Sequence, residues 1–295
     1  MTKRKIIIIS ASIFLLISIM LVVFVKNGKE QKNPLPEAFQ DETFPGEDEI
    51  EETEEEEADE EKVEPAAGRL SDKLRSVVTM IFNQEVNIVA IGDSLTQGVG
   101  DQTDQGGYVG ILERTMDSGE HDLAIHFSNY GKRGNRTDQM LDRLEDEEIQ
   151  ADIKKADIIL ITIGANDIMQ VVKENFTDIT LDLFTEERTH FEDRLREIIT
   201  TIHDLNGSAE IYLLGIYNPF EMYFEEIEEL NIIVNEWNET SIQITNEFEE
   251  ATFVPIQDIF DHASTNLFSD DNFHPNTTGY HRMAERVFEY LTKER

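Results

Sequence analysis

The stretch IVAIGDSLTQG, residues 88 to 98, joins an apolar run to a polar turn. The run carries no charge and ends at a glycine, which is typical of a buried strand in a parallel sheet. Asp93 and Ser94 follow at once, where the chain would leave the sheet. Gly-Asp-Ser is also ordinary turn chemistry, so this stretch alone leaves open whether Ser94 is a turn residue or a nucleophile.

Further apolar runs follow along the chain, separated by segments with helical periodicity. The predicted strands are residues 86–92, 124–130, 156–164, 209–215 and 251–256. In 191–207 and 225–249 the apolar residues recur at threes and fours, which predicts helices that pack on the sheet and place Trp237 in the core. Apolar strands that alternate with helices predict an α/β domain with a parallel sheet covered on both faces.

In such a sheet the site forms beyond the carboxyl ends of the strands. The segments that follow the predicted strands contain Ser94, the glycine turn 131–134, Asn166, the pair Tyr217 and Asn218, and, past a loop, Asp271 and His274. A serine hydroxyl becomes a nucleophile when an imidazole takes its proton, and a carboxylate can orient that imidazole. The amides of Ser94 and Gly134 and the side chain of Asn166 can donate to a developing oxyanion. This inventory predicts acyl transfer.

Four blocks, GDSLT, NYGKRGNRT, GAND and DNFHPN, occur in this order. Together they resemble the SGNH hydrolases, also called GDSL-type esterases and lipases, over about residues 84–292. The resemblance implies a flavodoxin-like three-layer α/β/α sandwich with a five-stranded parallel sheet, no cofactor, and ester hydrolysis through an acyl-enzyme on Ser94. It also implies that Asp271 and His274 complete a triad, and that Gly134 rather than Gly131 is the oxyanion donor.

The substrate stays open among short acyl esters, lysophospholipids and O-acyl groups of the cell envelope. The substrate-binding residues predicted from their places on loops are Tyr108, Tyr217, Asn218, Phe268 and Phe273. Two other functions use the same features: a non-catalytic envelope binding or scaffold domain of the same fold, and a peptidase or other acyltransferase. No His, Cys and carboxylate spacing typical of a metal site is present, so no metal is expected.

The first part of the chain has a different composition. Residues 6–25 are twenty uncharged, mostly apolar positions, long enough for a transmembrane helix, and no small-x-small cleavage site ends them. Lysine and arginine flank this span on both sides, so the charges hardly decide its orientation; we favour a cytoplasmic N-terminus and an extracytoplasmic domain. Residues 26–68 are proline- and carboxylate-rich, which predicts a solvated linker before a hydrolase domain at 69–295.

The acidic composition extends beyond the linker. The chain has 62 Asp and Glu against 25 Lys and Arg, a formal net charge of −37. Such a surface repels phosphate backbones, which excludes non-specific nucleic-acid binding. The expected partners are therefore an ester substrate and, through residues 6–25, a membrane.

Overall fold

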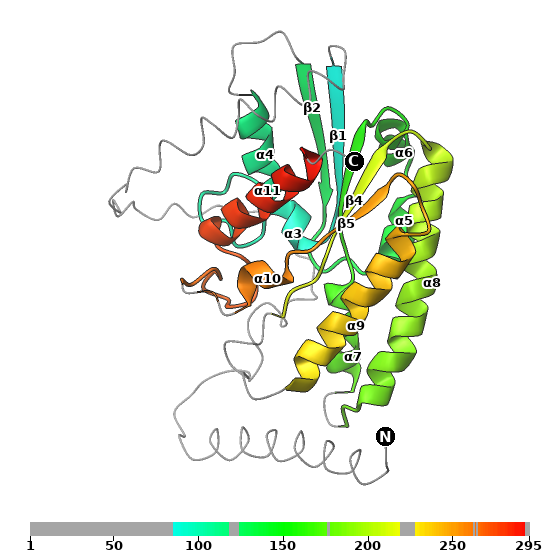
Figure 1. Cartoon of the computed structure of the whole chain (residues 1–295), viewed down its shortest axis with the longest axis vertical. Helices are drawn as coiled ribbons and strands as arrows, with labels where there is room; N and C mark the ends of the chain where they lie inside the picture. The colour runs from blue at the N-terminus through cyan, green and yellow to red at the C-terminus, as the bar shows by residue number, and fades with distance from the viewer. Residues whose placement is uncertain are drawn as a thin grey trace, which may run out of the picture.

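A parallel five-stranded sheet forms the centre of the computed structural model, which describes residues 85–117, 124–175, 178–218, 228–261, 263 and 265–292. The strand order is β2-β1-β3-β4-β5, and every neighbouring pair is parallel (Figure 1). The strands are β1 (Glu85–Gly92), β2 (Ala124–Gly131), β3 (Ile158–Thr162), β4 (Glu210–Leu214) and β5 (Ala251–Val254). The predicted parallel sheet is thus confirmed.

Three strands are shorter than predicted: β3 at both ends, β4 by one residue at each end, and β5 at its carboxyl end. β3 ends at Thr162 rather than at residue 164, because Gly164 has φ 109° and turns the chain into the next helix. β5 ends at Val254 rather than at residue 256, where Pro255 has no N–H to continue the ladder. In both cases local backbone chemistry stops the strand before the apolar run ends.

Helices cover both faces of the sheet and make three layers (Figure 1). On one face lie α3 (Ser94–Gln97), α4 (Gly107–Asp117), α10 (Gln257–Phe260) and α11 (Thr277–Leu291). On the other lie α5 (Thr137–Arg143), α6 (Glu147–Ile153), α7 (Ala165–Glu174), α8 (Leu181–Leu205) and α9 (Glu228–Thr245). Each layer encloses its own apolar cluster against the sheet.

The helix predicted at 191–207 is part of the longer α8, which ends at Leu205, and the helix predicted at 225–249 corresponds to α9, which ends at Thr245. Their apolar stripes are mostly buried. On α8, Phe191, Leu195, Ile198, Ile199 and Ile202 have no exposed surface. Trp237 of α9 is also fully buried and packs against Phe191 at a ring-centroid distance of 5.8 Å. These residues therefore belong to the core, as the periodicity predicted.

The strand order places the site. The chain runs from β1 to β2 on one side and then crosses to β3 on the other side of β1. The direction of winding therefore reverses between β1 and β3, and ligands bind outside the carboxyl ends of strands at such a switch point. Ser94 follows β1 and Asn166 follows β3, so both lie beside it.

The predicted N-terminal features lie outside the described residues. They are the anchor at 6–25, the linker at 26–68 and the first residues of the predicted domain, 69–84. Within the described part of the chain, no helix combines the length and the apolar character needed to cross a membrane.

Candidate active site

Ser94 begins the single-turn helix α3, which follows β1 after Asp93. Asp93 caps this helix by accepting a hydrogen bond from the Leu95 amide at 3.0 Å, and the Asp93 amide donates to the Thr162 carbonyl at 3.1 Å. A Cβ on Gly92 would lie 2.4 Å from Thr96 Oγ1 and 2.5 Å from Thr162 Oγ1, so only glycine fits this turn. The turn holds the Ser94 side chain at the sheet edge, 5% exposed.

His274 connects Ser94 to Asp271. His274 Nε2 lies 2.9 Å from Ser94 Oγ, and His274 Nδ1 lies 2.5 Å from Asp271 Oδ2. His274 is 2% exposed, so these contacts are sheltered from water. The arrangement matches a base that takes the serine proton while a carboxylate holds the ring and stabilises the imidazolium.

A tight loop before α11 fixes the histidine. The Ser269 amide donates to the His274 carbonyl at 2.8 Å, and Asn272 adopts φ 53°, a left-handed conformation that asparagine tolerates well. Asp271 Oδ1 accepts hydrogen bonds from the Ser269 hydroxyl and from the amides of Phe273 and His274. Burial alone would raise the pKa of Asp271, but the hydrogen bonds from His274 and Phe273 hold it well below its usual range. Asp271 is therefore ionised at neutral pH.

The three predicted oxyanion donors come from three segments at the same sheet edge. Ser94 is the first residue of α3, where an amide has no partner within the helix. Gly134 has φ 78°, a left-handed conformation that favours glycine, and a Cβ there would meet no atom within 4 Å. Asn166 donates one side-chain N–H to the Asn135 carbonyl at 3.1 Å, which leaves its second N–H for another acceptor.

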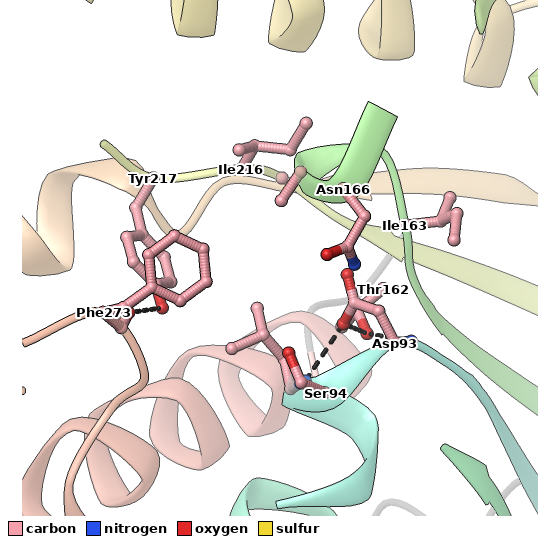
Figure 2. A pocket seen from close by; sticks show the side chains of 11 residues that line it. Asp93, Ser94, Thr162, Ile163, Asn166, Ile216, Tyr217 and Phe273 are labelled. Carbon is pink, nitrogen blue, oxygen red and sulfur yellow. Dashed lines mark hydrogen bonds between the residues drawn. The ribbon is translucent and has the colours of Figure 1, made fainter. Parts of the chain in front are cut away.

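A small cavity of about 30 Å³ opens beside Ser94. Its walls are Asp93, Ser94, Leu95, Thr162, Ile163, Ala165, Asn166, Gly215, Ile216, Tyr217 and Phe273. Figure 2 shows Asn166 on the wall near Thr162 and Asp93, with Tyr217 and Phe273 on another side. The Tyr217 hydroxyl donates to the Phe273 carbonyl at 2.8 Å, which joins the strand-β4 exit to the histidine loop.

Of the five residues predicted to bind substrate, only Tyr217 and Phe273 line this cavity. Tyr108 has no exposed surface, and its hydroxyl lies 3.3 Å from Thr96 Oγ1 inside the core. Phe268 packs against Tyr217 and Phe260, at centroid distances of 5.8 and 5.4 Å. Asn218 is 3% exposed and donates to Asn231 Oδ1 at 2.8 Å. The structure therefore places Tyr108, Phe268 and Asn218 outside the walls of this cavity, packed against neighbouring elements, and their role in substrate binding stays a prediction.

The sequence analysis missed Thr162, the last residue of β3. Its hydroxyl donates to Asp93 Oδ1 at 2.8 Å and lies 2.7 Å from Thr96 Oγ1, so it fixes the residue next to the nucleophile. Its position as the one polar residue at the end of the apolar run IILIT could have indicated this role from the sequence. No group of three or more His, Cys or acidic side chains in the described residues is placed to hold a metal ion.

The buried Asp93 predicts an unusual pH dependence of stability. Burial raises the pKa of Asp93 from 3.8 to about 6. Hydrogen bonds from Thr162 and Leu95 and the nearby His274 lower this pKa, but they do not offset the effect of burial. The folded protein therefore binds this proton more tightly than the unfolded chain, so the contribution of Asp93 to stability falls as pH rises from about 4 to about 6. Asparagine accepts the same hydrogen bonds without ionising. Asp93→Asn should therefore gain stability relative to wild type over this interval, by up to roughly 3 kcal/mol.

Denaturant unfolding at pH 4, 5, 6 and 7 measures this difference. Asp101→Asn is the matched control, because burial raises the pKa of Asp101 but hydrogen bonds from Thr103, Gly107 and Thr277 bring it below 3.8. The difference between that control and wild type should stay constant above pH 4. A constant difference for Asp93→Asn as well would contradict a raised pKa at Asp93.

Comparison with known proteins supports an ester-hydrolase site at Ser94. The model of the GDSL-like Lipase/Acylhydrolase family matches residues 90–282. The chain is 38% identical to YpmR of Bacillus subtilis over 72% of this chain and 83% of that protein, and 28% identical to the spore germination lipase LipC of Bacillus licheniformis over 67% and 92%. It superposes on the lipase Lip_vut3 from a goat rumen metagenome with a TM-score of 0.61 and 25% identity, over 70% of this chain and 96% of that chain.

The family match spans most of the described chain and includes all four sequence blocks. The structure provides the sheet order and a serine, histidine and aspartate within hydrogen-bonding distance at the sheet edge. The chain therefore belongs to the GDSL-like lipase/acylhydrolase family and is a carboxylic ester hydrolase of the GDSL type.

Proposed function

We propose that this protein hydrolyses esters of short acyl chains through a covalent acyl-enzyme on Ser94. The observation that carries the proposal is the continuous contact from Asp271 through His274 to Ser94, with distances of 2.5 and 2.9 Å, at the mouth of a cavity. Each group has one task in the reaction.

In the first step Ser94 Oγ attacks the ester carbonyl carbon while its proton moves to His274 Nε2. The carbonyl oxygen becomes an oxyanion, which the amides of Ser94 and Gly134 and the free N–H of Asn166 stabilise. The tetrahedral intermediate then collapses, the C–O bond to the alcohol breaks, and His274 gives its proton to the leaving oxygen. Throughout this step the ionised Asp271 holds the Nδ1–H of His274.

In the second step a water molecule replaces the alcohol. His274 takes a proton from that water, the resulting hydroxide attacks the acyl carbon, and a second oxyanion forms at the same donors. Its collapse returns the proton from His274 to Ser94 Oγ and releases the carboxylic acid.

The size of the cavity supports a short acyl group. A volume of about 30 Å³ has room for the equivalent of roughly two water molecules. The walls near Ser94 are mostly apolar, including Leu95, Ile163 and Ile216, and suit a methyl or ethyl group rather than a charged one. An O-acetyl group of an envelope polymer has these dimensions.

The test is hydrolysis of p-nitrophenyl esters from acetyl to palmitoyl, with a lysophospholipid in parallel, together with labelling by a fluorophosphonate. Peptide mass spectrometry should locate the label on Ser94. The kcat/KM should be highest for acetyl or propionyl and fall by at least about 10-fold for octanoyl, because methylenes that do not fit the cavity weaken transition-state binding. A maximum at palmitoyl or for the lysophospholipid would overturn the short-chain proposal. A folded protein without label or ester hydrolysis would favour the scaffold function.

Asn166 offers a second test of this chemistry. Asn166→Ala removes a side-chain donor and should lower kcat on the order of 10²- to 10³-fold with little change in KM, as for loss of one oxyanion donor elsewhere. Asn175→Ala is the control, since Asn175 lies at the other end of α7 and donates to the Val171 carbonyl. Near wild-type turnover in Asn166→Ala would show that this side chain does not meet the oxyanion.

The location of the enzyme is also part of the proposal. Residues 6–25 would anchor the protein in the cell membrane, with the acidic linker holding the hydrolase domain outside the cytoplasm. Protease added to intact spheroplasts should then digest the domain while leaving cytoplasmic markers intact. A domain protected until the membrane is permeabilised would reverse the orientation.

A further inference from the structure

A buried contact joins the start of α5 to the first turn of α7. The Thr137 amide lies 3.3 and 3.2 Å from the two carboxylate oxygens of Asp167, and the Thr137 hydroxyl donates to Oδ1 of the same carboxylate. Thr137 has no exposed surface and Asp167 is 1% exposed. A carboxylate this deeply buried is stable only when its oxygens are hydrogen-bonded and its charge is paired.

Arg194 of α8 supplies the paired charge. Its Nη2 lies 3.2 Å from Asp167 Oδ1, and its Nε donates to the Thr137 hydroxyl oxygen at 2.6 Å. The same Nη2 also pairs with Glu187. Three segments far apart in the sequence therefore meet at one cluster, in which Arg194 donates to Thr137 and Thr137 donates to Asp167.

This cluster lies directly behind two of the proposed oxyanion donors. Asp167 follows Asn166 in the chain, and Thr137 comes three residues after Gly134. Between them the Asn166 side chain donates to the Asn135 carbonyl, so the two donor segments already touch on the site side. The distance between the Gly134 amide and the Asn166 side chain therefore depends on how the start of α5 packs against the first turn of α7.

We infer that Thr137, Asp167 and Arg194 are positioning residues that set the spacing of the Gly134 and Asn166 donors. This inference rests on the proposed function, because it assigns the cluster a task in the oxyanion hole. A misplacement of about 1 Å in such a site can cost on the order of 10²-fold in rate. For stability alone, packed apolar residues would hold the helices together at least as strongly as this buried ionic cluster. The hydrogen bonds from Thr137 to Asp167, in contrast, fix a direction as well as a contact.

The first test compares Thr137→Val, Thr137→Ser and Arg194→Met in the full chain, with p-nitrophenyl acetate as the probe. Valine keeps the shape of threonine but removes the hydroxyl that links Arg194 to Asp167. Thr137→Val and Arg194→Met should lower kcat on the order of 10- to 100-fold while KM changes by less than about 3-fold. Thr137→Ser keeps the hydroxyl and should restore kcat to within a few-fold of wild type.

Arg196→Met is the matched control. Arg196 lies two residues further along α8 and pairs with Glu192 and Glu247, away from the donor segments. It should keep the wild-type kcat, although it too removes an arginine and its ion pairs from this helix. Equal losses in Arg194→Met and Arg196→Met would mean that α8 stability, and not donor spacing, controls the rate.

A double-mutant cycle with Asn166→Ala separates positioning from general damage. If Arg194 acts through the donors, adding Arg194→Met to Asn166→Ala should cost much less than it costs the wild-type protein. The same fold-loss in both backgrounds would overturn the inference, as would wild-type kcat in folded Thr137→Val and Arg194→Met. If Thr137→Val does not fold, the inference is tested by Arg194→Met alone. The Arg194 side chain is 24% exposed, so its replacement is expected to disturb folding less. Near wild-type turnover in Asn166→Ala would instead reject the proposed oxyanion hole.

Discussion

Replacing Ser94 with alanine should lower kcat for p-nitrophenyl acetate by on the order of 10⁴- to 10⁶-fold, the largest effect expected of any single change in this protein. The substitution removes the atom that would form the acyl-enzyme, so only attack by water remains. The Gly134 amide and the Asn166 side chain stay in place and would still stabilise an oxyanion. A small residual rate above that of water is therefore expected, as in other serine hydrolases that lose the nucleophile.

The fold should survive this substitution. Ser94 Oγ contacts His274, while the helix cap is made by Asp93 and the turn by Gly92. Circular dichroism and the unfolding midpoint should match those of wild type, and fluorophosphonate labelling should disappear. Ester hydrolysis that persists within about 10-fold of wild type would point to another nucleophile and would remove Ser94 from the mechanism.

Replacing Asp271 with asparagine is expected to have the second-largest effect, a loss in kcat on the order of 10⁴-fold. The Asp271 carboxylate accepts the Nδ1 hydrogen of His274, which leaves Nε2 free to accept the serine proton. An asparagine can present its N–H₂ group there instead, which favours the wrong tautomer and gives no charge to stabilise the imidazolium. KM should change little because Asp271 is not among the residues that line the cavity.

Asp270→Asn is the matched control for this measurement. Asp270 is the neighbouring carboxylate in the same loop and is exposed to solvent. The two substitutions make the same chemical change one residue apart, so loop damage would affect both. Similar kcat in the two variants would contradict the assignment of Asp271 to the triad.

The low pKa of Asp271 also bears on how wild-type activity depends on pH. The pKa of Asp271 is held well below its usual range, so Asp271 stays ionised through the neutral and mildly acidic range. Protonation of Asp271 should not limit activity above about pH 4. A fall in wild-type kcat in that range must therefore reflect another group.

Local sequence determined the elements and the chemistry of this protein. Mostly apolar runs, four of them ending at or just before a glycine, predicted the five strands, because strands inside a covered parallel sheet are rich in apolar residues. The carboxyl ends of parallel strands meet at one edge, so Ser94, Asn166 and the Asp271–His274 pair could be assigned to one site from their places along the chain. Short-range chemistry was sufficient there, since Asp271 and His274 are three residues apart and their contact forms within one loop.

The tertiary structure alone decided which side chains face the cavity. Tyr108, Tyr217, Phe268 and Phe273 are all aromatic residues predicted on loops beyond the strands, yet of these only Tyr217 and Phe273 line the cavity. An aromatic ring packs equally well into a core or a pocket wall, and which it does depends on the elements packed around it. The cluster of Thr137, Asp167 and Arg194 likewise joins residues 30 and 57 positions apart. Such contacts form only when the helices pack together. They could not be predicted from the sequence, because the periodicity of one segment does not show which residue of another segment it will contact.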